Sequence, residues 1–152
     1  MENQCLGLAE AAGLTPEVKR IRIRFPWTIL PAGMWPLPFR AATKGSDALT
    51  PPWPDILITC GRRSVPLSLA IRQKSEGKTF TVHIQNPTVS PSAFHMIVAP
   101  KHDGFTGPNV HLTHGALHRV TAARMKDDAK KFTPLYAHLP RPLVGVLIGG
   151  SN

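Results

Sequence analysis

The chain has 152 residues, 42% of them hydrophobic, and its 18 Lys and Arg against 9 Asp and Glu give a formal net charge of +9. This length and composition allow one domain with a hydrophobic core. They exclude a membrane-spanning helix, because no apolar run is longer than a strand, and the acidic start "MENQ" is not typical of a secretory signal peptide. We therefore expect a cytoplasmic protein in which Cys5 and Cys60 are free thiols.

The positive charge favours an anionic partner: nucleic acid, a phosphorylated ligand or an acidic membrane surface. The basic residues are dispersed, however, and the densest run, "KRIRIR" at 19–24, alternates with isoleucine as in a half-buried strand. No zinc-finger, RNA-recognition or basic-heptad signature is present. A basic nucleic-acid-binding domain is therefore the weakest of the functions considered.

The first elements in chain order are a helix from about residue 2 to Gly13 and a strand at 19–25. Residues 26–54 hold seven of the 16 prolines and cannot form one regular element. A helix capped by Ser64 is expected to run to about Glu76. Four further apolar segments are predicted to be strands: 55–60, 78–85, 94–100 and 109–115.

The end of the chain is predicted to form one more helix and one more strand. Thr121 is a suitable N-cap for the helix, and Pro134 is expected to kink or end it. Residues 143–150 form a continuous apolar strand pattern. Apolar strands separated by helices indicate an α/β fold with a parallel sheet covered by helices. Because the chain opens in a helix, we expect an unpaired sheet edge.

Several motifs occur in an order that resembles one known family across essentially the whole chain. They are "MENQCLGLAEAAGL", "CGRRS", "QNP", "PKHD", "GALHRV" and "VLIGGSN". As a set they resemble the mitochondrial-fission (elongated-mitochondria) family of glycosyltransferase-like proteins. That resemblance implies one half of a GT-B architecture, in which two Rossmann-like domains face each other across a cleft.

The resemblance also divides the chain and implies a function. Residues 1–142 would be the N-terminal Rossmann-like domain without its first strand, and 143–152 the first strand of a second domain, as in a chain truncated at both ends. The implied reaction passes a sugar from a nucleotide donor to an acceptor without a metal or other cofactor, and the chain alone is expected to be inactive. The alternative is a non-catalytic adapter at a dividing organelle's membrane.

Two loops at predicted strand ends carry the candidate chemistry. Gly61 allows a tight turn, and Arg62, Arg63 and the helix start at Ser64 are expected to bind an anion, such as a phosphate, at the carboxyl end of a strand. The alternative is a pair of solvated arginines. In "PKHD", His102 or Asp103 is the candidate general base for an acceptor hydroxyl, and the alternative is a loop turn with a capping Asp. The predicted site residues of the central loops are thus Gly61, Arg62, Arg63, Ser64, His102 and Asp103.

The chain ends supply the remaining candidates for substrate binding. The resemblance places Asn3 and Gln4 at the cleft, where their amides would bind a ligand; the alternative is an ordinary helix start. A glycine-rich turn after a strand can hold phosphate with its backbone N–H groups. The residues in that turn are Gly149, Gly150, Ser151 and Asn152.

Two further interpretations concern metals and membranes. A zinc site at His111, His114 and His118 is not expected, because His111 and His114 point to opposite faces of a strand.

Residues 26–54 combine Trp27 and Trp35 with basic residues, as in a peripheral contact with anionic membrane lipid. The alternative is an irregular lid packed over the sheet.

Overall fold

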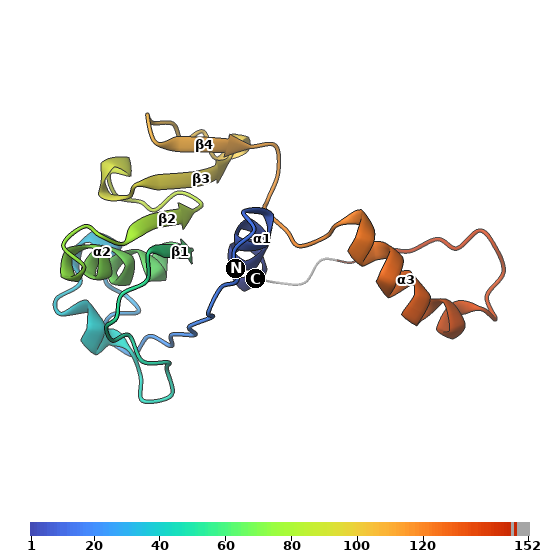
Figure 1. Cartoon of the computed structure of the whole chain (residues 1–152), viewed down its shortest axis with the longest axis horizontal. Helices are drawn as coiled ribbons and strands as arrows, with labels where there is room; N and C mark the ends of the chain where they lie inside the picture. Colours follow the sequence, from blue (N-terminus) through green and yellow to red (C-terminus); the bar gives the residue numbers. More distant parts are fainter. Residues whose placement is uncertain (147, 149–152) are drawn as a thin grey trace. The chain divides into compact units, whose positions relative to one another are not determined.

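The computed structural model describes residues 1–146 and residue 148, and the chain divides into two compact units, Met1–Arg119 and Val120–Asn152. The first unit is built on a four-stranded parallel sheet with the strands in sequential order (Figure 1). This confirms the predicted α/β fold with a Rossmann-like parallel sheet. The strands are β1 (Ile56–Cys60), β2 (Phe80–Ile84), β3 (Met96–Pro100) and β4 (Val110–Thr113).

Two α-helices belong to this unit, α1 (Glu2–Ala11) and α2 (Val65–Lys74). Both were predicted, and α2 ends where a glycine was expected. Gly77 has φ +78°, and its N–H donates to the carbonyl of Arg72 at 2.9 Å, which closes the helix end. Glycine takes this backbone conformation without steric cost. The Pro-rich region 26–54 forms only loops and the short turns η1 (Ala32–Met34) and η2 (Pro38–Ala41), which pack against α2.

In-register pairing decides which side chains share a face of the sheet. Thr59, His83 and Ile97 are consecutive partners, and the next residue of each strand points to the opposite face. Val65 of α2 packs with Ile97, whereas Gln4 of α1 bonds to Cys60, the residue after Thr59. The helices α1 and α2 therefore lie on opposite faces.

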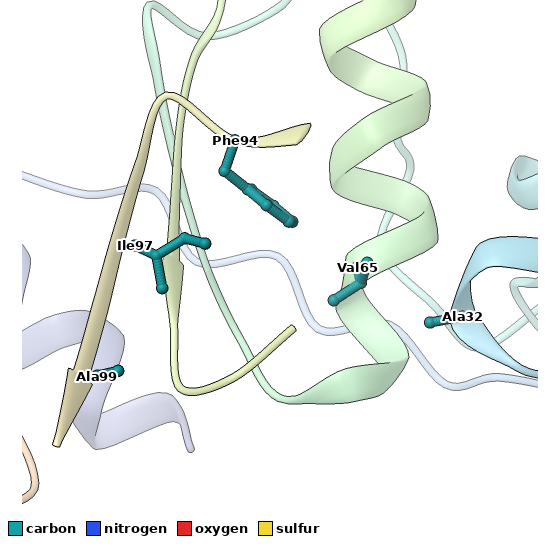
Figure 2. Packing of buried hydrophobic residues seen from close by; sticks show 5 residues of the cluster. All are labelled: Ala32, Val65, Phe94, Ile97 and Ala99. Atoms are coloured by element: carbon teal, nitrogen blue, oxygen red, sulfur yellow. The ribbon is translucent and has the colours of Figure 1, made fainter. Parts of the chain in front are cut away.

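The core lies between β3 and α2. Figure 2 shows Val65 with Ala32 of η1 on one side and Phe94, Ile97 and Ala99 on the other. Val65, Ile97 and Ala99 are fully buried. Burial of side chains as large as those of Val65 and Ile97 contributes roughly 1.5–3 kcal/mol each to folding. This cluster therefore holds α2 and η1 against the sheet.

The strand predicted at 19–25 was wrong. The segment makes only an isolated antiparallel bridge between Ile23 and Ala42, with backbone bonds from Arg24 to Ala41 and from Thr43 to Arg22, both 2.9 Å. Its partner lies in the Pro-rich region, where the turn η2 leaves few residues extended. The alternation of isoleucine with basic residues was therefore not enough to place this segment in the sheet.

Among the described residues β1 pairs only with β2, as expected for an unpaired sheet edge. The side chains of Leu57, Ile58, Thr59 and Cys60 are accordingly only partly buried, whereas those of β2 after its first residue are buried. The apolar character of β1 is that of an interior strand, although its position in the sheet is at the edge.

The second unit contains α3 (Ala122–Tyr136), whose N-cap was predicted correctly. Thr121 accepts a hydrogen bond from the Arg124 N–H at 3.2 Å. Pro134 lies inside the last turn, and the helix ends two residues later. Residues 143–146 form no strand. The remainder of the predicted strand lies largely outside the described residues, so the division of the chain into 1–142 and 143–152 stays a prediction.

A close approach of two segments leads to the first testable prediction. A Cβ atom on Gly7 of α1 would lie 2.5 Å from the carbonyl oxygen of His118, a backbone atom whose displacement costs free energy. Gly7→Ala should therefore lower the free energy of unfolding by about 1–2 kcal/mol, although alanine favours helix. Gly45→Ala is the control, since nothing lies within 4 Å of its Cβ position. Urea unfolding of both variants measures this, and an unchanged or raised stability for Gly7→Ala would contradict the close approach.

His83 makes the stability of this fold depend on pH. Its side chain is fully buried, Nδ1 lies 2.9 Å from Thr59 Oγ1, and Nε2 has no hydrogen-bond partner in the described part of the chain. The centroid of the His83 ring also lies 4.9 Å from the centroid of the Phe94 ring. Burial lowers the pKa of His83 to about 4, because the charged ring would lose its hydration.

We therefore expect stability to fall as the pH falls from about 6.5 towards 4. In that range the unfolded chain binds a proton at this histidine and the folded chain does not. The loss between pH 7 and pH 4.5 should be about 2 kcal/mol. His83→Leu should remove this component from urea unfolding curves, and His138→Gln, at an exposed position, is the control. The prediction is wrong if His83→Leu and the parent chain lose equal stability over this range.

Candidate functional site

A cleft of about 520 Å³ lies at the carboxyl edge of the sheet. Its apolar floor is formed by Ile84, Val98 and Pro100, at the ends of β2 and β3. The register places Ile84 beside Val98, on the face of the sheet that α1 covers. Parallel strands present their carboxyl ends at one edge, which is where ligands of open α/β sheets bind.

The remaining lining is mostly polar, apart from the short segment after β4. It comes from α1, from the loop after β2, from the turn after β3 and from the end of β4. These residues are Gln4, Gln85, Asn86, His102, Asp103, Thr113, Gly115, Ala116 and Leu117. Three predicted site residues from distant parts of the sequence, Gln4, His102 and Asp103, are thus brought to one cleft.

Gln4 joins α1 to the ends of β1 and β2. Its Oε1 accepts from the thiol of Cys60 at 3.1 Å and from Nε2 of Gln85 at 3.3 Å. These bonds leave the NH₂ group of Gln4 available to a ligand as donor. Asn3, which was predicted to bind together with Gln4, is exposed and does not line the cleft.

The loop after β2 holds its residues in an uncommon backbone conformation. Gln85 has φ +81° and Thr88 has φ +59°, which non-glycine residues rarely adopt. The Gln85 N–H donates to the carbonyl of Val98 at 2.8 Å, and Asn86 Oδ1 accepts from the Thr88 N–H at 2.9 Å. Strain of this kind costs of order 1–3 kcal/mol and clusters at functional sites. Hydrogen bonds hold the side-chain amides of both residues where they line the cleft, since Gln85 donates to Gln4 and Asn86 accepts from Thr88.

Gln85 and Asn86 were not among the predicted site residues. Their motif "QNP" contributed to the family resemblance but was given no role. A signal was present, because a polar pair followed by proline directly after a buried strand is typical of a loop at the carboxyl edge of a sheet.

His102 and Asp103 lie in η5 (Lys101–Asp103), the turn directly after β3. His102 Nε2 is 3.4 Å from Asp103 Oδ1, and the Asp103 side chain is 27% exposed. Gly104 ends the turn with φ +62°. If Nε2 carries the proton and faces the carboxylate, Nδ1 is the proton acceptor of the pair.

The "CGRRS" segment lies at the same edge but outside the cleft lining. Gly61 has φ +85°, and a Cβ there would lie 2.5 Å from the sulfur of Met1, so the position requires glycine. Arg62 and Arg63 are exposed in η3 (Arg62–Ser64), ahead of α2. Their predicted anion binding stays a prediction.

The expectation that Ser64 caps α2 was wrong. Its hydroxyl donates to the carbonyls of Cys60 and Gly61, at 3.2 and 2.8 Å, and makes no cap hydrogen bond to the helix. The turn η3 continues directly into α2, so residue 64 already has helical dihedrals and cannot take the extended conformation of an N-cap. The predicted phosphate-binding residues Gly149, Gly150, Ser151 and Asn152 lie outside the described residues.

The two tryptophans proposed to contact a membrane are held by the protein itself. Trp27 Nε1 donates to the carbonyl of Pro36 at 2.9 Å, and Trp35 Nε1 to that of Leu30 at 3.2 Å. Trp35 is only 9% exposed. The exposed apolar side chains of this region are instead Phe25, Ile29, Met34 and Leu37.

Within the described part of the chain, no three His, Cys, Asp or Glu side chains are close enough to hold a metal ion. None of the helices described is both long and apolar enough to cross a membrane. His114 Nε2, from the histidine-rich segment, lies 3.2 Å from the Lys101 amine.

The fold and the cleft define an α/β domain with a candidate ligand site at the carboxyl ends of parallel strands. A family model described as "Mitochondrial fission ELM1" matches residues 1–152, and the chain belongs to this family. This confirms the resemblance drawn from the motifs. No solved structure matches the chain.

A curated relative is similar to part of the chain. It is the "Mitochondrial fission protein ELM1" of Arabidopsis thaliana, which is 31% identical over 119 residues. The match covers 63% of this chain and 28% of the relative. The chain thus corresponds to little more than a quarter of the length of that protein.

Proposed function

We propose that the cleft binds a sugar and forms one wall of a nucleotide-sugar-dependent glycosyltransferase site. The observation that supports this is the gathering of three side-chain amides, Gln4, Gln85 and Asn86, with the His102–Asp103 pair around one cleft. Amides both donate and accept hydrogen bonds, as sugar hydroxyls require. The apolar floor can pack against the C–H face of a sugar ring.

In the proposed reaction an acceptor hydroxyl attacks the anomeric carbon of the donor sugar. His102 takes the hydroxyl proton, and Asp103 orients the imidazole and stabilises its charged form. The bond between the anomeric carbon and the nucleotide diphosphate breaks, and the diphosphate keeps the electron pair. Arg62 and Arg63, exposed at the end of β1, are the proposed partners of that anion.

This proposal assigns the diphosphate of the donor to Arg62 and Arg63 and the nucleoside to the second domain of a GT-B architecture. The chain by itself is then expected to bind sugar without transferring it. A binding measurement is therefore the test of this wall of the site, because it does not depend on turnover.

The 152-residue chain should bind UDP-N-acetylglucosamine more tightly than UDP, because only the former carries a sugar for the cleft. Gln85→Leu should weaken this binding about tenfold, which corresponds to about 1.4 kcal/mol from lost hydrogen bonds. The same change at Gln73, an exposed residue of α2, is the matched control. NMR titration gives both the affinities and the location of the shifted signals.

Equal affinity for UDP and the sugar nucleotide would contradict the sugar site. So would an unchanged affinity in Gln85→Leu, or shifts confined to residues far from the cleft. Circular dichroism of the two variants controls for loss of fold.

A separate observation supports a second proposed function. Several apolar side chains near η1 and η2 are exposed. Phe25, Ile29, Met34 and Leu37 are 74%, 72%, 70% and 63% exposed. The exposed basic residues Arg24 and Arg40 lie in the same region. We propose that this apolar loop, residues 25–37, docks peripherally on an anionic membrane surface, as an adapter in organelle division would.

Flotation with vesicles containing phosphatidylserine should recover the chain, and vesicles of phosphatidylcholine alone should recover much less. The double variant Ile29→Ser/Leu37→Ser should lose most of the binding, because it removes apolar area that would enter the interface. Leu14→Ser, an exposed leucine outside the loop, is the control. Equal recovery of the double variant and the parent chain would exclude this docking mode.

A further inference from the structure

The segment that follows β4 forms one wall of the cleft and then reaches α1 (Figure 1). Its residues 115–117 line the cleft. The next residue touches α1, because the carbonyl oxygen of His118 lies 2.5 Å from the position that a Cβ on Gly7 would take. We call residues 115–119 the strap, since they connect the end of the sheet to α1 along the cleft.

Side-chain hydrogen bonds hold the strap at both ends. At its start, Thr113 Oγ1 donates to the Gly115 carbonyl at 2.6 Å. At its end, the Arg119 guanidinium bonds to both carboxylate oxygens of Glu10 in α1, with Nε donating to Oε2 at 3.0 Å and Nη2 donating to Oε1. A two-point contact between arginine and a carboxylate fixes the orientation of both groups. Arg119 is also the last residue of the first compact unit, so this contact fixes the strap where the chain leaves that unit.

The middle of the strap depends on these end contacts. Within the described part of the chain, the backbone N–H groups of Ala116 and Leu117 make no hydrogen bond. A segment with few hydrogen bonds of its own opens at a low free-energy cost unless its ends are held. The ion pair at Arg119 therefore determines how well this wall of the cleft is ordered.

The position of Glu10 in α1 supports a role outside the helix. Glu10 lies in the last turn, which contains no basic residue. A carboxylate there is disfavoured by the helix dipole, whereas Glu2 in the first turn is favoured by it. Arg119 offsets the unfavourable charge of Glu10, so the ion pair benefits both the helix and the strap.

We propose that Arg119 is a positioning residue of the cleft, which holds the strap against α1 through its ion pair with Glu10 and so orders the wall that a ligand contacts. Arg119 itself does not line the cleft, and it acts through residues 115–117. The effect on a ligand rests on the proposed sugar binding, whereas the ordering of the strap does not.

The first test measures order in the strap without any ligand. In the parent chain, ¹⁵N order parameters of Ala116, Leu117 and His118 should be close to the value of about 0.85 that is typical of rigid backbone. In Arg119→Gln they should fall below about 0.6, while those of β2 and β3 stay unchanged.

A charge exchange and a matched variant show whether the ion pair is the cause. Glu10→Arg/Arg119→Glu should return the strap to the order of the parent chain, because it restores the pair with its charges reversed. Glu2→Gln is the control, since it removes a similar two-point contact of α1, with Arg20 at 2.8 and 2.7 Å, away from the strap. The strap should keep its order in Glu2→Gln.

The second test measures the effect on the cleft. Arg119→Gln should weaken the binding of UDP-N-acetylglucosamine about fivefold, a loss in the range of a well-oriented surface ion pair. The charge exchange should recover the affinity of the parent chain. A purely structural contribution would instead lower the urea stability of Arg119→Gln and leave the strap as ordered and the affinity as high as in the parent chain.

Unchanged order parameters at residues 116–118 in Arg119→Gln would overturn the proposal. So would a charge exchange that fails to restore order, or an equal loss of order in Glu2→Gln. If the parent chain binds no sugar nucleotide but its strap loses order in Arg119→Gln and regains it in the charge exchange, the sugar site is contradicted and the role of Arg119 in the strap is supported.

Discussion

The parallel, in-register pairing of β1 to β4 is the constraint on which the other features of the first unit depend. It places all four carboxyl ends at one edge, where Gln85 and the His102–Asp103 pair follow their strands. The pleat then assigns alternate residues to opposite faces. One face receives α2 and the packed core around Val65 and Ile97, and the other receives α1 and the cleft.

The loop after β2, at the cleft edge, contains two of the non-glycine residues with positive φ that the described part of this unit has. Gln85 and Thr88 have positive φ angles, and Gly61 leaves no room for a side chain beside Met1. Gln4 Oε1 accepts hydrogen bonds from Cys60, at the end of β1, and from Gln85, directly after β2, and so ties these two strand ends to α1. A site in which several loops are fixed at once is preorganised, so a ligand would not have to supply the free energy for ordering them. Each of the amides that we propose to bind sugar makes at least one side-chain hydrogen bond within the protein.

The two proposed functions use different parts of the molecule. Sugar binding uses the carboxyl edge of the sheet, whereas membrane docking uses the apolar loop at residues 25–37. Membership of the mitochondrial fission family is shown by the match over residues 1–152 and does not by itself select either function. Because the surfaces are separate, one protein can have both activities, and each can be removed by substitutions that leave the other surface unchanged.

The sequence by itself determined the three helices, the four strands of the sheet, the α/β class and the family. Apolar runs, glycine stops and the Thr121 cap act over a few residues, so local patterns reveal them. It also identified Gln4, His102 and Asp103 as candidate site residues. Only the tertiary structure decided that the 19–25 segment stays outside the sheet, that Trp35 is buried while Ile29 is exposed, and that Gln4 meets Cys60. These outcomes depend on contacts between residues far apart in the chain, because strand pairing and burial are set by the partner segment as much as by the segment itself.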